Sequence, residues 1–415
     1  MTTSTLRGLV PSWGAAVLLL VASSGLMPVS TDNGPSTTVS PDMSSTTNVT
    51  QGTWSQLPST ARAVVPLARS MASMAYDFAD HYVLLFGGNS GLPRWNGFLN
   101  DTWAFQNGTW TNLTAGLTTA PCPRGDAPMT YDARDGVILL VGGYDGGNVP
   151  GCPIYSLNDT WEFSHGRWIH LPARLPAGGS YDGLLSYDAE DGYPLYFGGN
   201  ASNQTYKFVG GAWVLLHPVA SPPGVQWMTR SATMTYDSAD RQVVLFGGPL
   251  GSGLNETWAF TGGNWSVVSS SPSPPGSPAP GTSSLSDFST RGFELLADSP
   301  VASSGNLSGD LQAWEFAANS WVNVSGPVSP PPRVGFSTTF DPVANATILF
   351  GGSRSTLSGC CLLNETWVWE ALASGPSSGS HPGSSVVPWL VGSLAVTLVL
   401  SLATVVFFTR LRKKR

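Results

Sequence analysis

The sequence predicts an all-β protein made of six four-stranded sheets arranged in a closed ring. Charged residues are only 11% of the 415 residues while glycine (48) and proline (33) are plentiful, which disfavours long helices and suits short strands joined by turns. A two-part pattern also recurs six times, with a period of roughly 50 residues. A four-stranded unit of that length cannot bury both faces alone, so the units are expected to pack around an axis as a β-propeller.

The first part of the pattern is a pair of strands, a and b. A strand of small residues ends at an aromatic residue and Asp, and an apolar strand then ends in Gly-Gly, as in "MAYDFADHYVLLFGG". The interval from the Asp to the first glycine is the same in five copies, as from Asp77 to Gly87, and a sixth copy keeps this spacing between Asp287 and Ala297 without the glycines. The constant spacing predicts a hairpin of fixed length, and Gly-Gly predicts a close backbone approach or a bulge.

The second part is another pair of strands, c and d, marked by two aromatic residues at a constant spacing, such as Trp103 and Trp110. The last copy, "LLNETWVWE", has no second tryptophan after Trp367. In five copies the strand-d tryptophan precedes the next Asp by a nearly constant interval, as Trp110 precedes Asp132, and the interval from Trp54 to Asp77 matches it. We therefore expect the N-terminal segment around Trp54 to supply strand d of the sixth blade and to close the ring.

Segments at both ends of the chain carry membrane signals. The apolar run "AAVLLLVA" follows Arg7, and no ionisable residue appears before Asp32, as in a secretory signal peptide; an uncleaved anchor is the alternative. Residues 386–409 are uncharged and long enough to span a bilayer as a helix. The cations of "RLRKKR" follow directly, so the positive-inside rule predicts a single-pass cell-membrane protein with an extracellular propeller and a cytoplasmic C-terminus. A processed sorting tail is a further alternative.

The predicted organisation divides the chain as follows: signal peptide 1–28, Ser/Thr-rich linker 29–52, propeller 53–371, Gly/Ser/Pro tether 372–385, transmembrane helix 386–409 and basic tail 410–415. Within the propeller we expect the closing strand at 53–58 and blades one to six at 70–114, 126–172, 181–218, 230–270, 282–325 and 335–370.

The repeated pattern resembles that of the kelch family over about residues 53 to 370, in the apolar run ending in Gly-Gly, the later "NDTW" and the second tryptophan. Two copies depart from it: the third has Tyr206 for tryptophan, and the fifth lacks both Gly-Gly and the Asn-x-Thr triplet before Trp314. The resemblance implies a six-bladed propeller similar to the central domain of galactose oxidase. That enzyme needs a copper site of Tyr, His and a Cys-linked Tyr, and the few histidines here are scattered. Sialidase-type Asp boxes are not found in the sequence either, so we predict no catalytic residue, no metal site and no cofactor.

Binding residues are expected in the longest b–c links, those of blades one, two and six, which are neighbours in a closed ring. The candidates are aromatic and arginine residues typical of binding hot spots: Trp95, Phe98, Arg94, Tyr144, Tyr155 and Arg354. The alternative is that these aromatic rings fold back onto their own loops.

The four cysteines and the acidic a–b turns each allow more than one interpretation. Cys122 and Cys152 are candidates for a disulfide in an exported protein, while the adjacent Cys360 and Cys361 can form a vicinal pair, bridge elsewhere or stay free. Turns such as "YDFADH" could be taken for calcium loops, but they lack dense oxygen ligands, and we expect the Asp to cap its own turn. Glycosylation candidates outside the repeat motif are Asn48, Asn107, Asn112, Asn200, Asn264, Asn306, Asn323 and Asn345.

The function predicted from these features is a non-enzymatic, surface-anchored module that binds an extracellular protein or glycan. The net charge of −7, with no basic stripe before the C-terminal tail, argues against a nucleic-acid partner. The alternatives are a carbohydrate-active enzyme of propeller type, oxidase or sialidase-like, and a purely structural envelope protein.

Overall fold

The structure is a computed structural model that describes residues 52–58, 64–91, 97–146, 151–152, 156–176, 182–200, 202–224, 232–248, 255–268, 273–274, 283–288, 293–298, 307, 309–354 and 361–371. All of them belong to one compact unit of the chain, Val49–Arg415. Within these residues no helix is long and apolar enough to cross a membrane. The predicted signal peptide and transmembrane segment lie outside the described residues.

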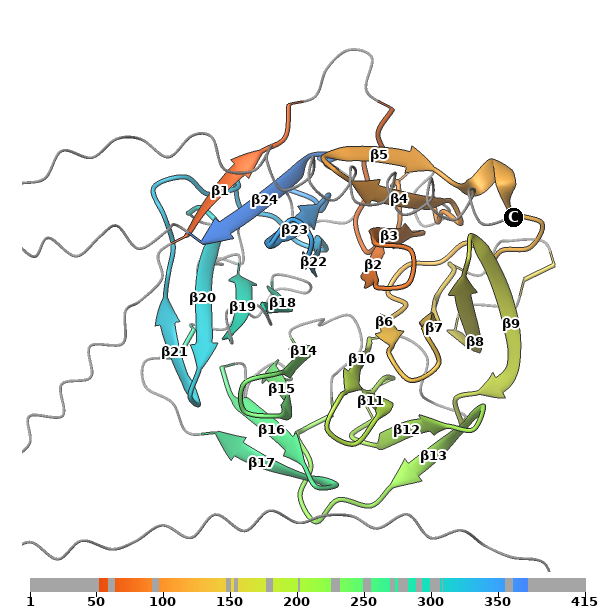
Figure 1. Cartoon of the computed structure of the whole chain (residues 1–415), viewed down its shortest axis with the longest axis vertical. Helices are drawn as coiled ribbons and strands as arrows, with labels where there is room; N and C mark the ends of the chain where they lie inside the picture. The colour runs from red at the N-terminus through yellow and green to blue at the C-terminus, as the bar shows by residue number, and fades with distance from the viewer. Residues whose placement is uncertain are drawn as a thin grey trace, which may run out of the picture. The chain divides into compact units, whose positions relative to one another are not determined.

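Over the described residues the chain folds into six four-stranded antiparallel sheets, the blades of a β-propeller (Figure 1). Blades one to three are β2 (Ser73–Asp77), β3 (Tyr82–Phe86), β4 (Thr102–Gln106) and β5 (Thr109–Asn112); β6 (Met129–Asp132), β7 (Val137–Tyr144), β8 (Ser156–Ser164) and β9 (Arg167–Arg174); and β10 (Gly183–Asp188), β11 (Tyr193–Gly198), β12 (Thr205–Val209) and β13 (Ala212–Leu216). A short 3-10 helix, Thr114–Gly116, follows β5.

Blades four to six complete the ring. They are β14 (Ala232–Asp237), β15 (Gln242–Gly247), β16 (Thr257–Thr261) and β17 (Asn264–Val268); β18 (Ser283–Phe288), β19 (Phe293–Asp298), β20 (Gln312–Ala317) and β21 (Ser320–Asn323); and β22 (Ser337–Asp341), β23 (Ala346–Phe350), β24 (Thr366–Ala371) and β1 (Gly52–Gln56). The fifth blade forms although it lacks Gly-Gly, as its preserved spacings predicted.

The N-terminal strand closes the ring, as predicted. β1 pairs antiparallel with β24 at the outer edge of blade six, and the inner strands β2 and β22 contact each other across the seam (Figure 1). Trp54 lies opposite Trp369, two residues beyond Trp367, just as Trp110 lies opposite Phe105 in blade one. The closing strand begins at Gly52, one residue earlier than expected, and blade two extends to Arg174 beyond a register shift at Asp159/Thr160.

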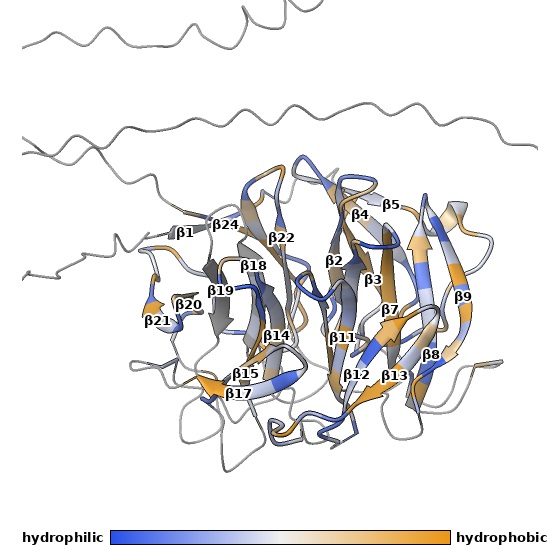
Figure 2. Ribbon diagram, turned by 60° about the horizontal axis from the view of Figure 1, so that its bottom comes forward, coloured by the Kyte–Doolittle hydropathy of each residue, from blue (hydrophilic) through white to orange (hydrophobic). Residues whose placement is uncertain are grey.

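The core lies between the blades, and strand b is almost completely buried in each of the five blades whose strand-b burial is described. Six consecutive residues of β7 are buried, from Ile138 to Gly143, because neighbouring blades cover both faces of the strand. β9, at the rim, is mostly exposed and buries only Trp168 and Ala173, and Figure 2 shows the same contrast between a largely hydrophobic β7 and a mixed β9. The propeller therefore stacks sheet on sheet around its axis.

In blades one to five the tryptophan of strand d ties the blade to the one before it. Its indole nitrogen donates to the hydroxyl of a strand-c threonine, the last residue of the Asn-x-Thr triplet, in the preceding blade. The five described donor–acceptor pairs are Trp110–Thr366, Trp168–Thr102, Trp213–Thr160, Trp265–Thr205 and Trp321–Thr257, at 2.8–3.0 Å. The Thr of the repeated Asn-x-Thr triplet thus links its blade to the next one by accepting this hydrogen bond.

The Gly-Gly pair brings two blades into backbone contact, as expected. Gly88 donates its amide proton to the Arg124 carbonyl at 2.8 Å, and Gly352 donates to the Arg69 carbonyl at 2.9 Å. Both glycines have positive φ, 98° and 94°. A Cβ on Gly87 would lie 2.5 Å from the Arg124 carbonyl oxygen, so a side chain does not fit here.

Candidate functional site

Two of the predicted binding residues meet on the loop face, the end of the ring formed by the b–c links and the d–a links. Phe98 comes from the b–c link of blade one, and Tyr144 is the last residue of β7 in blade two. Their ring centroids are 5.5 Å apart at an interplanar angle of 75°, which is an edge-to-face contact. Both side chains are half-buried, so an aromatic pair spans two blades and stays partly accessible.

Gly125 holds this pair in place. Its backbone exchanges two hydrogen bonds of 2.9 Å with Tyr144, and a Cβ on Gly125 would lie 3.1 Å from a ring carbon of Phe98. The next residue, Asp126, has a φ of 60° and donates its amide proton to the Met71 carbonyl at 3.1 Å. The aromatic pair therefore lies directly beside the first residues of the inner strands.

A cavity of about 200 Å³ opens at this point, at the centre of the ring. All six blades contribute to its wall, which carries both apolar and polar side chains. Apolar members include Met74, Met129, Leu185 and Met234, and polar members include Asp126, Asp182, Thr233, Ser284, Ser337 and Thr338. Asp126 and Asp182 hold the same position in blades two and three, and both have a left-handed backbone, with φ of 60° and 58°.

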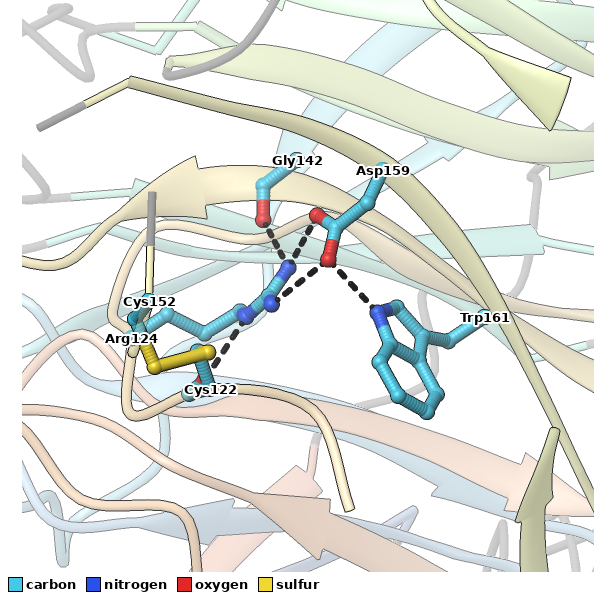
Figure 3. The surroundings of a disulfide bond; sticks show 6 residues. All are labelled: Cys122, Arg124, Gly142, Cys152, Asp159 and Trp161. Atoms are coloured by element: carbon cyan, nitrogen blue, oxygen red, sulfur yellow. Dashed lines mark hydrogen bonds and ion pairs between the residues drawn. A yellow bond between two sulfur atoms is a disulfide. The ribbon is translucent and has the colours of Figure 1, made fainter. Parts of the chain in front are cut away.

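The predicted disulfide is confirmed. Cys122 in the link into blade two is bonded to Cys152 in the b–c link of that blade (Figure 3). The Cys122 carbonyl also accepts a 2.9 Å hydrogen bond from Nε of Arg124, one residue before Gly125. The bond thus fixes the segment that supports Tyr144.

Among the described residues, Arg124 is one of three buried arginines that fasten a blade to the d–a link leading into it. Its guanidinium donates to both carboxylate oxygens of Asp159 at 2.7 and 2.9 Å and to the Gly142 carbonyl at 2.8 Å (Figure 3). Oδ2 of Asp159 also accepts a 2.6 Å hydrogen bond from the indole nitrogen of Trp161. Burial alone would raise the pKa of Asp159, but its hydrogen bonds and charge interaction with Arg124 lower it, so the carboxylate is ionised.

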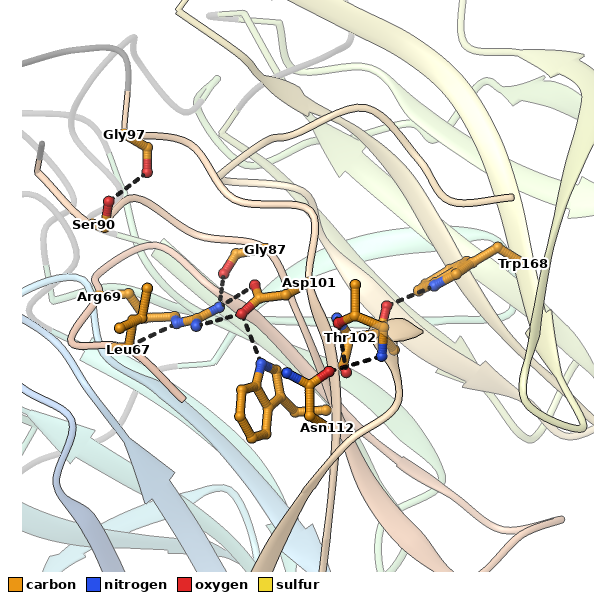
Figure 4. A network of polar contacts seen from close by, with 11 residues as sticks. Leu67, Arg69, Gly87, Ser90, Gly97, Asp101, Thr102, Asn112 and Trp168 are labelled. Carbon is orange, nitrogen blue, oxygen red and sulfur yellow. Dashed lines mark hydrogen bonds and ion pairs between the residues drawn. The ribbon is translucent and has the colours of Figure 1, made fainter. Parts of the chain in front are cut away.

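The same arrangement recurs in blades one and six. Arg69 donates to Asp101 at 2.6 and 2.7 Å, and Asp101 accepts from Trp103 (Figure 4). Arg333 donates to Glu365 at 3.0 Å, where Glu365 also accepts from Trp367. We call these three sets the arginine clamps. Sequence reasoning missed them, although each arginine precedes the first glycine of its Gly-Gly pair by the same interval, as Arg69 precedes Gly87.

The remaining binding candidates are only partly placed. Trp95, Arg94 and Tyr155 lie outside the described residues. Arg354 is exposed and its guanidinium pairs with Glu365 of its own blade at 3.1 Å. Cys361 is exposed and Cys360 lies outside the described residues, so the predicted alternatives for this pair stay open.

The acidic turns cap themselves, as predicted. Oδ1 of Asp77 accepts the backbone N–H groups of Ala79 and Asp80 at 2.9 and 3.2 Å. The equivalent bonds are made by Asp132, Asp188, Asp237 and Asp341. Among the described residues no group of three or more His, Cys, Asp or Glu could hold a metal ion. Six of the glycosylation candidates are exposed, Asn107, Asn112, Asn200, Asn264, Asn323 and Asn345, and Asn48 and Asn306 lie outside the described part.

Comparison with known proteins identifies the fold. No protein-family model matches the chain, and no curated protein matches it. The solved structure of YjhT is 16% identical, covers 73% of this chain and 95% of its own, and has a TM-score of 0.51. A fungal alcohol oxidase of the AA5 family in complex with copper (14% identity; 72% and 62% coverage; TM-score 0.45) and a gluconolactonase from Xanthomonas campestris (10%; 79% and 93%; 0.46) are more distant. At 16% identity the likeness to YjhT shows a shared fold alone.

Proposed function

We propose that this chain is a kelch-type propeller, anchored at the cell surface, that recognises an extracellular protein or glycan through its loop face without catalysing a reaction. The observation that carries the proposal is the edge-to-face contact of Phe98 and Tyr144 on the loop face. Tyr144 is bonded to Gly125, and the next residue, Asp126, lines the central cavity. Two blades contribute the rings, so the surface exists before any ligand arrives.

The physical case rests on preorganisation. Aromatic side chains bury a large area on binding and lose little conformational entropy when already held in place. Tyr144 is held by Gly125, and the Cys122–Cys152 bond fixes the neighbouring link. The cavity beside them combines apolar walls with a few convergent carboxylates and hydroxyls, the usual composition of a small-molecule or glycan pocket.

The surface location is supported by the sequence. Residues 386–409 are uncharged and precede five cations, and the apolar run near Arg7 suits export. The disulfide fits the oxidising environment outside a cell. The repeat spacings and their Gly-Gly and Trp positions support the kelch assignment.

A second candidate, a carbohydrate-active enzyme, is favoured by one observation. Asp126 and Asp182 line the same cavity from neighbouring blades, and glycoside hydrolysis uses a pair of carboxyl groups. This candidate differs from the first in that the bound glycan would be cleaved.

The test is binding of the full chain to a glycan panel and to a panel of purified surface proteins. We expect saturable binding to one of them, lost in Phe98→Ala and in Tyr144→Ala. Ile169→Ala, which removes an exposed apolar side chain from β9, serves as the matched control and should bind normally. Binding that survives both aromatic substitutions would refute the proposed site, and product release that disappears in Asp182→Asn would assign the enzyme instead.

A further inference from the structure

The opposite end of the ring, which carries the a–b turns, concentrates the negative charge of the protein. Five turns, 77–81, 132–136, 188–192, 237–241 and 341–345, hold ten of the chain's 26 acidic residues and only two arginines. The adjacent described c–d turns add His165 and Arg167. Because the whole chain has a net charge of −7, the remainder is close to neutral, and the charge lies on this a–b face.

The acidic residues of these turns fall into two groups, those that cap the turn and those that do not. The first Asp of each turn caps its own backbone and is buried, as Asp132 is. The acidic residue three positions later points outward: Asp135, Asp191 and Asp240 are exposed, and Asp80 is half-buried. A second set of carboxylates therefore lies at the a–b turns of four blades, and three of them are exposed. In this set Asp80 and Asp191 each also accept one hydrogen bond, from the hydroxyls of Tyr82 and Tyr193.

Tyrosine side chains lie beside the acidic turns. Tyrosine precedes the capping Asp in four consecutive blades, at Tyr76, Tyr131, Tyr187 and Tyr236. In all four, burial raises the pKa most, and the largest charge effect comes from the capping Asp of the preceding blade. The pairs are Tyr76 with Asp341, Tyr131 with Asp77, Tyr187 with Asp132 and Tyr236 with Asp188. Aromatic side chains therefore lie next to carboxylates on the a–b face.

One exposed aromatic residue joins two of these blades. Phe78 is 50% exposed, and its ring lies 4.8 Å from that of Tyr76 and 5.1 Å from that of Tyr131. An exposed phenyl ring normally costs solvation energy, and here it is held against two tyrosines beside Asp80. Such a combination suits a cation that can stack on a ring and also donate hydrogen bonds to a carboxylate.

Tyr76 provides an independent observation. Its side chain is 4% exposed, and within the described part of the chain its hydroxyl has no hydrogen-bond partner. Burial raises the pKa of Tyr76, and the charges of Asp341 and Asp77 raise it further, to about 12. A buried hydroxyl of this kind is a place where a ligand donor or a bound water is expected.

We propose that the a–b face binds an arginine-rich segment of a partner polypeptide, with a guanidinium stacked on Phe78 and hydrogen-bonded to Asp80. Further cations would lie over Asp135 and Asp240 in blades two and four. A guanidinium is favoured over a metal ion because the carboxylates are spread around the ring, and among the described residues they form no cluster that could hold a metal. This surface is separate from the loop face, so the two proposals can fail independently.

The test uses the full chain and a fluorescein-labelled hexa-arginine peptide, with a Gly-Ser hexapeptide as the probe control. We expect the triple variant Asp80→Asn, Asp135→Asn, Asp240→Asn to weaken binding at least tenfold. Phe78→Ala should weaken hexa-arginine binding about three- to tenfold and hexalysine binding less, since lysine stacks poorly. Asp310→Asn removes an exposed carboxylate from the b–c link of blade five and should bind like the wild type.

Several outcomes would overturn the proposal. If Asp310→Asn weakened hexa-arginine binding as much as the triple variant does, or if Phe78→Ala did not weaken it, the binding would be non-specific attraction by net charge. Displacement of the peptide by millimolar Ca²⁺ at constant ionic strength would assign the face to a metal ion. Near-UV circular dichroism of each variant identifies a folding defect. If Phe78→Ala is partly unfolded, the ratio of its affinities for hexa-arginine and hexalysine still tests the stacking, because that ratio does not depend on the folded fraction.

Discussion

The indole nitrogen of Trp54 is buried without a hydrogen-bond partner among the described residues, because Ala313 occupies the strand-c position that holds a threonine in the other five blades. The two residues share one buried cluster at the seam between blades five and six. Five other described strand-d tryptophans donate to that threonine. The closing strand is therefore held by backbone pairing and packing, but lacks the side-chain bond that links the other blades.

Restoring that bond should stabilise the ring. Ala313→Thr places a hydroxyl where the indole of Trp54 can donate to it, and we expect a gain of about 1 kcal/mol in the free energy of unfolding. Ala313→Val has nearly the same shape without the hydroxyl and is the control for added volume. Urea denaturation of both variants measures the difference, and equal stabilities would show that the indole does not reach the new group.

The arginine clamp of blade two should stabilise the fold only when both Arg124 and Asp159 are present. Arg124 is fully buried and Asp159 is 9% exposed, so Arg124→Met leaves an uncompensated charge and should cost about 3–5 kcal/mol. Blades three and five have no clamp in the described residues and carry Gln204 and Gln312 at the position of Asp159. The double variant Arg124→Met, Asp159→Gln copies that solution and should recover more than half of the loss in chemical denaturation. A double variant no more stable than the single one would contradict the charge argument.

The disulfide should stabilise the fold, by an amount that grows with the logarithm of the length of the loop that it closes. Cys122 and Cys152 have a sequence separation of 30, and the loss of such a cross-link corresponds to about 3.5 kcal/mol in the chain-entropy model. We expect Cys122→Ser with Cys152→Ser to lower the melting temperature by several degrees, and Cys361→Ser to have a smaller effect. Peptide mapping without reducing agent checks the bond directly, and two unpaired thiols at these positions would refute it.

The turn of blade three should make stability depend on pH. Burial raises the pKa of Asp188 to about 6, and the neighbouring Asp191 and Glu190 charges add to this, although backbone hydrogen bonds oppose it. A carboxyl whose folded pKa is above its unfolded value stabilises the fold most at low pH, and its contribution is lost as the pH rises from about 4 through 6. Asp188→Asn should keep the cap, because its side-chain oxygen still accepts both N–H groups, and should be more stable than the wild type at pH 7. Denaturation at pH 4.5 and 7 tests this; an unchanged pH dependence in the variant would contradict it.

Much of the fold could be predicted because its rules are local or periodic. A fixed count from Asp to Gly-Gly defines a hairpin whatever surrounds it, and the missing tryptophan after Trp367 led to Trp54 as the closing residue. The Cys122–Cys152 bond followed from the placement of both cysteines in links on one face. Strand ends were less well predicted, since a register shift lengthens β8 and β9 in a way that no spacing reveals.

The candidate site was predicted less completely. Phe98 and Tyr144 were chosen from loop composition, and their contact depends on Gly125, which comes from the d–a link rather than from either b–c link. The arginine clamps went unnoticed because each arginine and its carboxylate are far apart in the chain, as Arg69 and Asp101 are, and their pairing needs the blade to be folded.

By itself the sequence determined the repeat, the order of strands, the position of the closing strand and the self-capping acidic turns, because each depends on spacing along the chain. The tertiary structure alone decided which side chains meet between blades: the tryptophan–threonine bonds, the cavity shared by six inner strands, and the aromatic contacts on the two faces of the ring. Those contacts join residues that are distant in the chain, and only closure of the ring brings them together.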